Sequence, residues 1–237
     1  MGACKRDWPN ALPRAFLLVP HSFRPKLEIL PTAQRELWNA LAPAAALDFV
    51  LYGGTAIALQ LGHRHSIDFD FFGHRPLNKV ALKEAMPFLD GAAVFQDEPN
   101  TLVVSVDRPA GPVKLSFFGG LSLGRVGEPR RTSDDVLVIA SLVDLLATKL
   151  KAILDRAEAK DYVDLAALLR SGLALERGLA AFQTLFGGEP AVALKAIGYF
   201  DDGDLSEVPE EDRALLCGAR DRVRKIPVLP KLSQSLV

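Results

Sequence analysis

The chain has 237 residues, of which 49% are apolar and 24% are charged, proportions that are ordinary for a water-soluble globular protein. Its 28 basic and 29 acidic residues leave a net charge of −1, which argues against a strongly basic nucleic-acid-binding protein but leaves room for a local basic patch. The two cysteines, Cys4 and Cys217, form neither a metal-binding nor a disulfide pattern, and the first ten residues lack the apolar segment of a signal peptide. We therefore expect a cytoplasmic protein.

Prolines crowd the first thirty positions and predict an irregular segment there. A helix is expected over residues 32–42, where apolar side chains recur at helical spacing, and Pro43 should end it. The next stretch, 43–62, is apolar and about as long as a membrane span, but polar residues and a glycine pair interrupt it. We interpret it as a strand over 48–52, a tight turn and a helix over 55–61, so no membrane span is expected.

Glycine and proline punctuation separates the elements that follow. A helix is expected at 77–86, a polar connector at 125–135, and strands at 67–72, 92–96, 101–106, 113–118 and 136–140. From a capping-box-like start at Ser141 onward the pattern is helical, with helices expected at 141–157, 160–170, 176–186, 189–199 and 209–224. The predicted fold class is therefore α+β: a small mixed sheet with flanking helices over residues 1–140, followed by a helical domain over 141–237. Residues from Arg220 onward are expected to form a loosely held basic tail.

Two aspartates, Asp68 and Asp70, lie two positions apart on the strand expected at 67–72. Such side chains project from the same face of a strand, close enough to share a divalent cation. Two neighbouring anions on a half-buried strand repel each other, and a bound Mg²⁺ would relieve that repulsion. Taken alone, the pair is more typical of an exposed edge strand.

A glycine pair, Gly53-Gly54, precedes these aspartates at a strand-to-helix turn. There, backbone N–H groups and the helix N-terminus favour a phosphate group. Thr55 or Ser66 can add a hydroxyl to a phosphate oxygen, and Arg64 a positive charge. A phosphate-binding turn together with metal-binding carboxylates predicts phosphoryl or nucleotidyl transfer.

This order of elements resembles the signature of the polymerase-β-like nucleotidyltransferase superfamily, which has Gly-Gly-Ser/Thr, a helix, and then Asp-apolar-Asp-apolar. The fuller strings YGGTAIAL at 52–59 and GHRHSIDFDFF at 62–72 resemble the AbiEii/AbiGii toxin family within it. Two later segments resemble further motifs of that family. They are DLLATKLKA, which begins at Asp144, and KDYVDL, which begins at Lys160 and follows Arg156.

The resemblance implies a polymerase-β-like nucleotidyltransferase core and a set of site residues. For Mg²⁺ these are Asp68 and Asp70; for the nucleotide, Gly53, Gly54, Thr55, Arg64 and Ser66; and for catalysis, beside the two metal ligands, Lys149, Asp161 and Asp164. A lysine held near a triphosphate offsets charge that builds up in the transition state. Without the motif, Lys149 would also be compatible with a surface lysine, and Asp161 or Asp164 with a helix cap.

One departure from the superfamily pattern concerns a third carboxylate, commonly carried on a later strand. Here that strand is 113–118, and the matching position holds Ser116. Either Asp161 or Asp164 fills the gap, or one metal suffices, or the chain is catalytically weak. Three histidines near the first motif lack the spacing of a zinc site: His63, His65 and His74.

The function implied by the resemblance is a Mg²⁺-dependent nucleotidyltransferase that moves NMP from an NTP to an acceptor and releases pyrophosphate. It would act as the toxin of a toxin–antitoxin or phage-defence pair, with RNA, in particular tRNA, as acceptor and a cognate antitoxin protein as partner. Arg125, Arg130 and Arg131, together with the basic residues after Arg220, could supply a local basic surface for RNA. Two alternatives stay open: a nucleotide-binding module of the same fold with weak catalysis, and transfer to a protein or a small molecule such as an aminoglycoside.

Overall fold

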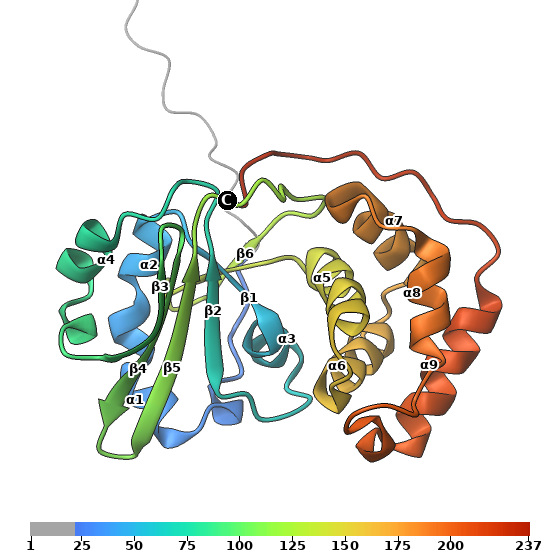
Figure 1. The fold of residues 1–237 in the computed structure, drawn as a ribbon, viewed down its shortest axis with the longest axis horizontal. Helices are drawn as coiled ribbons and strands as arrows, with labels where there is room; N and C mark the ends of the chain where they lie inside the picture. Colours follow the sequence, from blue (N-terminus) through green and yellow to red (C-terminus); the bar gives the residue numbers. More distant parts are fainter. Residues whose placement is uncertain (1–21) are drawn as a thin grey trace, which may run out of the picture.

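The computed structural model describes residues 22–237 and forms a mixed sheet flanked by helices (Figure 1). Most of the irregular segment expected over the first thirty residues, and Cys4, lie outside the described residues. The strands are β1 (Val50–Tyr52), β2 (Asp68–Phe72), β3 (Ala93–Glu98), β4 (Thr101–Arg108), β5 (Gly111–Phe118), β6 (Arg130–Arg131) and β7 (Val138–Ile139). The α-helices are α1 (Thr32–Leu37), α2 (Pro43–Ala46), α3 (Gly53–Leu61), α4 (Lys79–Ala85), α5 (Leu142–Asp155), α6 (Ala159–Arg170), α7 (Leu175–Phe186), α8 (Pro190–Ile197) and α9 (Glu210–Arg222).

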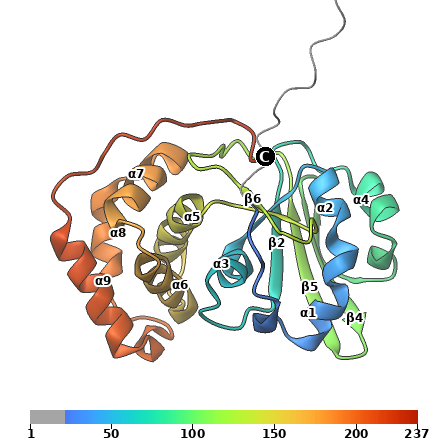
Figure 2. The ribbon, with the colours of Figure 1, turned by 180° about the vertical axis from the view of Figure 1, so that it is seen from behind.

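The strands described form one sheet in the order β3-β4-β5-β2-β1-β7-β6. Strand β2 lies at its centre, antiparallel to β1 and parallel to β5. Helices α1 and α2 cover one face of this sheet (Figure 2), and α3 lies between the sheet and the pair α5 and α6. The expected α+β architecture with a mixed sheet is therefore confirmed.

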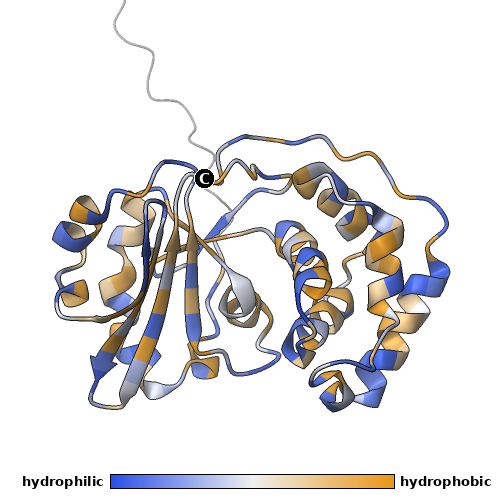
Figure 3. Ribbon diagram, viewed as in Figure 1, coloured by the Kyte–Doolittle hydropathy of each residue, from blue (hydrophilic) through white to orange (hydrophobic). Residues whose placement is uncertain are grey.

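The expected alternation along β2 is present in the structure. Phe69 and Phe71 are fully buried, whereas Asp68, Asp70 and Phe72 are partly exposed on the opposite face. The ring of Phe71 stacks on Phe117 of β5 at a centroid distance of 5.0 Å. The alternating hydrophobic and hydrophilic bands of β2 and β5 are visible in Figure 3. One face of these strands therefore forms core, which leaves the other free for polar chemistry.

The helical half begins as the capping pattern predicts. The hydroxyl of Ser141 accepts a hydrogen bond from the backbone N–H of Asp144 at 3.1 Å, which caps α5. Helix α5 packs against α6, α7, α8 and α3. Buried residues of both halves, such as Leu59 and Leu145, belong to one hydrophobic cluster. The two halves therefore share a core, and the site described below lies between them.

Three local expectations were wrong. The connector expected at 125–135 contains strand β6, whose two residues pair with β7 at the edge of the sheet. The stretch after Pro43 begins with the short helix α2 instead of leading directly into a strand, because this proline occupies the first turn, where its missing N–H costs nothing. The third wrong expectation is that the C-terminal tail is loosely held.

The tail is not loosely held over its length. After α9 it returns across the helices to the sheet (Figures 1 and 2). The N–H of Leu232 donates to the carbonyl of Arg125 at 2.8 Å, and Leu236 is 1% exposed. Burial of Leu236 and this backbone hydrogen bond favour a fixed position for the end of the tail, so a terminal position alone is a poor guide to mobility. No helix in residues 22–237 combines the length and the apolar character that crossing a membrane requires.

Candidate active site

A polar cavity of about 480 Å³ lies where β2 and the start of α3 face the helical half. Of the residues predicted from sequence, it brings together Gly53, Gly54, Arg64, Ser66, Asp68, Asp70 and Lys149. Further lining side chains are His65, Ile67, Lys114, Arg156, Glu158 and Lys160. Thr55, Asp161 and Asp164 do not line the cavity and are buried beside it.

The two glycines are required for close packing at the turn into α3. Gly53 has a φ of +75°, and a Cβ there would lie 2.5 Å from Oδ2 of Asp70. A Cβ on Gly54 would collide with the guanidinium group of Arg64. The turn therefore admits a carboxylate on one side and a guanidinium on the other, because both glycines lack side chains.

The side chain of Thr55 connects this turn to β2 by hydrogen bonds and does not line the cavity. Its hydroxyl is 2.7 Å from Oγ of Ser66 and is also hydrogen-bonded to the backbone carbonyl of Asp68. Thr55 is 1% exposed, whereas Ser66 lines the cavity. Of the two hydroxyls predicted for phosphate contact, Ser66 is therefore the one that borders the space a ligand would enter.

Asp70 is an anion in an unfavourable environment. Burial, and next the charge of Asp68, raise its pKa above the ordinary aspartate value, although Ser116 lowers it by a hydrogen bond. The parallel register places Ser116 directly opposite Asp70 on β5. A carboxylate with such a pKa is stabilised by a nearby cation.

The donor set available for a cation is small. Among the described residues, no group of three or more His, Cys, Asp or Glu side chains is arranged to hold a metal ion. Mg²⁺, however, is commonly bound through one or two carboxylates, while water and substrate phosphates complete its coordination. Asp68 and Asp70, which both line the cavity, fit that pattern.

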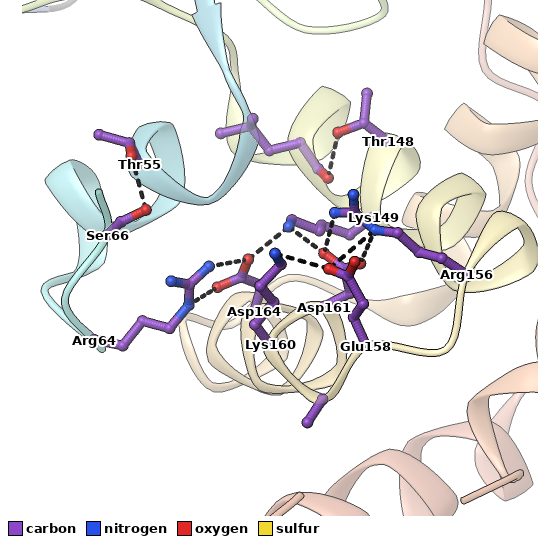
Figure 4. Close-up of polar contacts among 12 residues, drawn as sticks. Thr55, Arg64, Ser66, Thr148, Lys149, Arg156, Glu158, Lys160, Asp161 and Asp164 are labelled. Atoms are coloured by element: carbon purple, nitrogen blue, oxygen red, sulfur yellow. Dashed lines mark hydrogen bonds and ion pairs between the residues drawn. The ribbon is translucent and has the colours of Figure 1, made fainter. Parts of the chain in front are cut away.

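Asp161 and Asp164 turn their oxygens toward cations of the cavity wall (Figure 4). Nζ of Lys149 lies 2.6 Å from an oxygen of each. Arg64 grips Asp164 through Nε and Nη2, at 2.7 and 2.8 Å, and Nε of Arg156 donates to Asp161 at 2.8 Å. The two aspartates, three residues apart on α6, thus hold three cations that border the cavity.

Both aspartates are ionised at neutral pH despite full burial. Burial raises each pKa, but hydrogen bonds and cations outweigh it: Arg156 and Lys149 for Asp161, and His63, Arg64 and Lys149 for Asp164. Both pKa values consequently lie below the usual range. The carboxylates position the cations and leave the space near Asp70 free for a ligand.

Sequence reasoning assigned no site role to several residues of this arrangement, among them Arg156, His63 and Lys114. Nε2 of His63 lies 2.6 Å from Oδ1 of Asp164. No local sequence pattern could predict this contact, because 101 positions separate the two residues. Lys114 lies opposite Asp68 on β5 and lines the cavity. The alternation Lys-Leu-Ser within 113–118 could have placed Lys114 on the same face as Ser116.

The arginines expected to offer a basic surface are engaged with neighbours. Arg125 pairs with Glu128 at 2.7 Å, and Arg131 with Asp135 at 3.0 Å. The guanidinium of Arg130 lies 4.7 Å from the ring centre of Phe23. The two ion pairs partly offset the positive charge of this region.

Residues 36–223 match a protein family described as nucleotidyl transferase AbiEii toxin, type IV toxin–antitoxin system. The chain is also 32% identical over 144 residues to an uncharacterized protein of Aquifex aeolicus (strain VF5), which covers 60% of this chain and 68% of that protein. The family match spans every residue of the cavity wall described above. The chain belongs to the AbiEii family of nucleotidyl transferase toxins of type IV toxin–antitoxin systems.

Proposed function

We propose that the protein is a Mg²⁺-dependent nucleotidyltransferase that moves NMP from an NTP to a hydroxyl of an RNA acceptor, tRNA in particular, and is controlled by a cognate antitoxin. The observation that carries this proposal is the composition of one cavity. It combines the two β2 carboxylates with a glycine turn and with cations held by buried aspartates. That combination suits a triphosphate and a divalent cation better than a neutral ligand.

The residues have separable roles in this reaction. Asp68 and Asp70 hold Mg²⁺, which supplies Lewis-acid stabilisation of the phosphate charge. The N–H groups at Gly53 and Gly54 and the hydroxyl of Ser66 orient the phosphates. Lys149, Arg64 and Arg156 offset the negative charge of the departing pyrophosphate. Asp161 and Asp164 hold these three cations in position.

The chemical step is an in-line displacement. The acceptor hydroxyl oxygen forms a bond to the α-phosphorus as the bond from that phosphorus to the bridging oxygen of the β-phosphate breaks. Pyrophosphate leaves with that electron pair. The hydroxyl proton is released to water.

A nucleotide-binding module with weak catalysis is the second candidate. It is favoured by Ser116, which stands opposite Asp70 where superfamily members commonly carry a carboxylate. A hydroxyl neither ligates Mg²⁺ as an anion does nor serves as a base at neutral pH.

The test is incorporation of each labelled NTP into total tRNA by the purified protein with Mg²⁺. We expect label transfer that EDTA abolishes and that falls roughly a hundredfold or more in Asp68→Asn. Asp107→Asn, an exposed aspartate on β4, is the matched control and should retain wild-type transfer. Nucleotide that raises the melting temperature without any label transfer would favour the binding module instead.

A further inference from the structure

The face of the β2–β5 ladder that carries the active-site carboxylates changes character along its length. Three cross-strand pairs follow one another on it: Asp68 with Lys114, Asp70 with Ser116, and Phe72 with Phe118. Alternate residues of a strand are spaced by roughly 7 Å. The face therefore passes from charged to aromatic within two such steps, and Asp70 lies in the middle.

The aromatic end borders a second cavity, of about 300 Å³. Its wall includes Tyr52, Phe72 and Phe118 from the sheet, and Thr148 and Ala152 from α5. The rings of Tyr52 and Phe72 stack at 4.6 Å, and Phe118 meets Phe72 edge-on at 5.5 Å. Phe72 and Phe118 are partly exposed, so an aromatic surface is open to a ligand.

The two cavities meet at the reacting centre. Gly53, Asp70, Lys149 and Arg156 line both of them. The remaining cations, Arg64, Lys114 and Lys160, belong to the first cavity alone. A ligand that spans the junction would thus have its most highly charged part on one side of Asp70 and an uncharged, planar part on the other.

We propose that this aromatic cavity is the acceptor subsite and that it binds the terminal nucleobase of a single-stranded polynucleotide. The assignment rests on the nucleotidyltransferase function proposed above. In-line displacement requires the attacking hydroxyl to approach opposite the leaving pyrophosphate. The pyrophosphate belongs on the cation-rich side, so the acceptor enters from the aromatic side.

The lining of this cavity selects among acceptor classes. Stacking on aromatic side chains is the usual way in which proteins hold unpaired bases, and it tolerates any base because each has a π-face. A polycationic acceptor such as an aminoglycoside would need several free carboxylates. Beyond Asp70, which we assign to Mg²⁺, the described lining offers the carboxylate of Asp155, and Lys151 already pairs with it.

The experiment compares two oligoribonucleotides that differ in one group. Both end in a 3′-hydroxyl, but one has an abasic terminal nucleotide, so that its backbone charge is unchanged. Binding is measured by fluorescence anisotropy with Mg²⁺ and a non-hydrolysable NTP, and label transfer is measured in parallel. The wild-type protein should bind the intact oligonucleotide roughly five- to a hundredfold more tightly than the abasic one.

The Phe118→Leu variant keeps an apolar side chain but loses the stacking surface. It should bring the two oligonucleotides to within about twofold of each other while NTP affinity stays at the wild-type value. Phe95→Leu, a 69% exposed aromatic on β3, is the matched control and should keep the full preference. Melting temperatures of both variants establish that they are folded, and the wild-type comparison needs no variant.

Each other outcome has a distinct meaning. Equal binding of the two oligonucleotides by the wild-type protein overturns the subsite. A loss of NTP affinity in Phe118→Leu with an unchanged oligonucleotide preference assigns the cavity to the base of the NTP instead, and label found on protein overturns the nucleic-acid acceptor. Base-dependent binding without any label transfer would refute the proposed reaction but leave the nucleobase subsite in place.

Discussion

At the scale of single residues, Asp70 shows how tightly the site is constrained. The missing Cβ of Gly53 makes room for its carboxylate, and Ser116 hydrogen-bonds to it across the strand pair. Its raised pKa means that the ionised carboxylate opposes folding at neutral pH. The protein thus carries this anion at a cost in stability.

Asp70→Asn should therefore be more stable than the wild type at neutral pH in the absence of metal. Its transfer of labelled nucleotide to tRNA should nevertheless fall roughly a hundredfold or more. Because the folded-state pKa of Asp70 is raised, its penalty is present at high pH. It should shrink as the pH falls through the folded pKa and vanish below the unfolded value of about 3.9. Thermal unfolding of the wild type and of Asp70→Asn, measured from neutral pH to below the unfolded pKa, checks this change in relative stability.

Asp107→Asn, on the exposed part of β4, is the control and should show no comparable gain. Mg²⁺ should raise the melting temperature of the wild type and not that of Asp70→Asn. An Asp70→Asn variant less stable than the wild type at neutral pH would contradict the raised pKa.

At the scale of elements, Lys149 joins helices α5 and α6. Its ammonium group, on a residue 5% exposed, bridges the buried carboxylates of Asp161 and Asp164. Removing one partner of a buried ion pair leaves the other charges uncompensated, which costs far more than the loss of a surface pair. The same side chain thus connects the stability of the helical half to the wall of the candidate active site.

Lys149→Met should lower the free energy of unfolding by about 3–5 kcal/mol. Lys151→Met, two positions along the same helix, removes an exposed pair with Asp155 and should cost about 0.3–0.5 kcal/mol. Urea unfolding monitored by circular dichroism measures both. Equal effects of the two substitutions would show that the network adds no stability.

At the scale of the whole molecule, the C-terminal tail closes the chain back onto its first half. It leaves α9, passes Thr184, whose hydroxyl donates to the carbonyl of Leu229 at 2.8 Å, and reaches Arg125. Leu236 is buried near the end of the chain. The tail therefore links the helical half to the first half of the chain a second time, in addition to the core shared by α3, α5 and α6.

Leu236→Ala should lower the free energy of unfolding by about 2–5 kcal/mol, because a buried leucine is lost and a cavity remains. Val228→Ala, at a position 95% exposed in the same tail, should change it by no more than about 0.5 kcal/mol. Thermal or urea unfolding of the two variants measures both free-energy changes and so distinguishes a packed tail from a disordered one. A Leu236→Ala variant as stable as the Val228→Ala control would contradict the packing described here.

Several features could be predicted from local sequence patterns. Alternation over 67–72 placed Asp68 and Asp70 on one face, and the glycine pair marked the turn into α3. Helical spacing after Ser141 predicted α5 to α9 close to their observed bounds. Such features follow from the periods of strand and helix and from the conformational freedom of glycine, which act over a few residues.

The remaining features depend on residues that are far apart in the chain. The contact between Arg64 and Asp164 spans 100 positions, and the pairing of Phe72 with Phe118 depends on the register of β2 with β5. Thr55 lies behind the cavity and Ser66 on its wall, although either hydroxyl suited a phosphate. Burial and long-range pairing arise from the packing of the whole chain, which no window of sequence contains. The polar character of the site could thus be predicted from the residue types, whereas only the fold decided which of these side chains line the cavity and which support it.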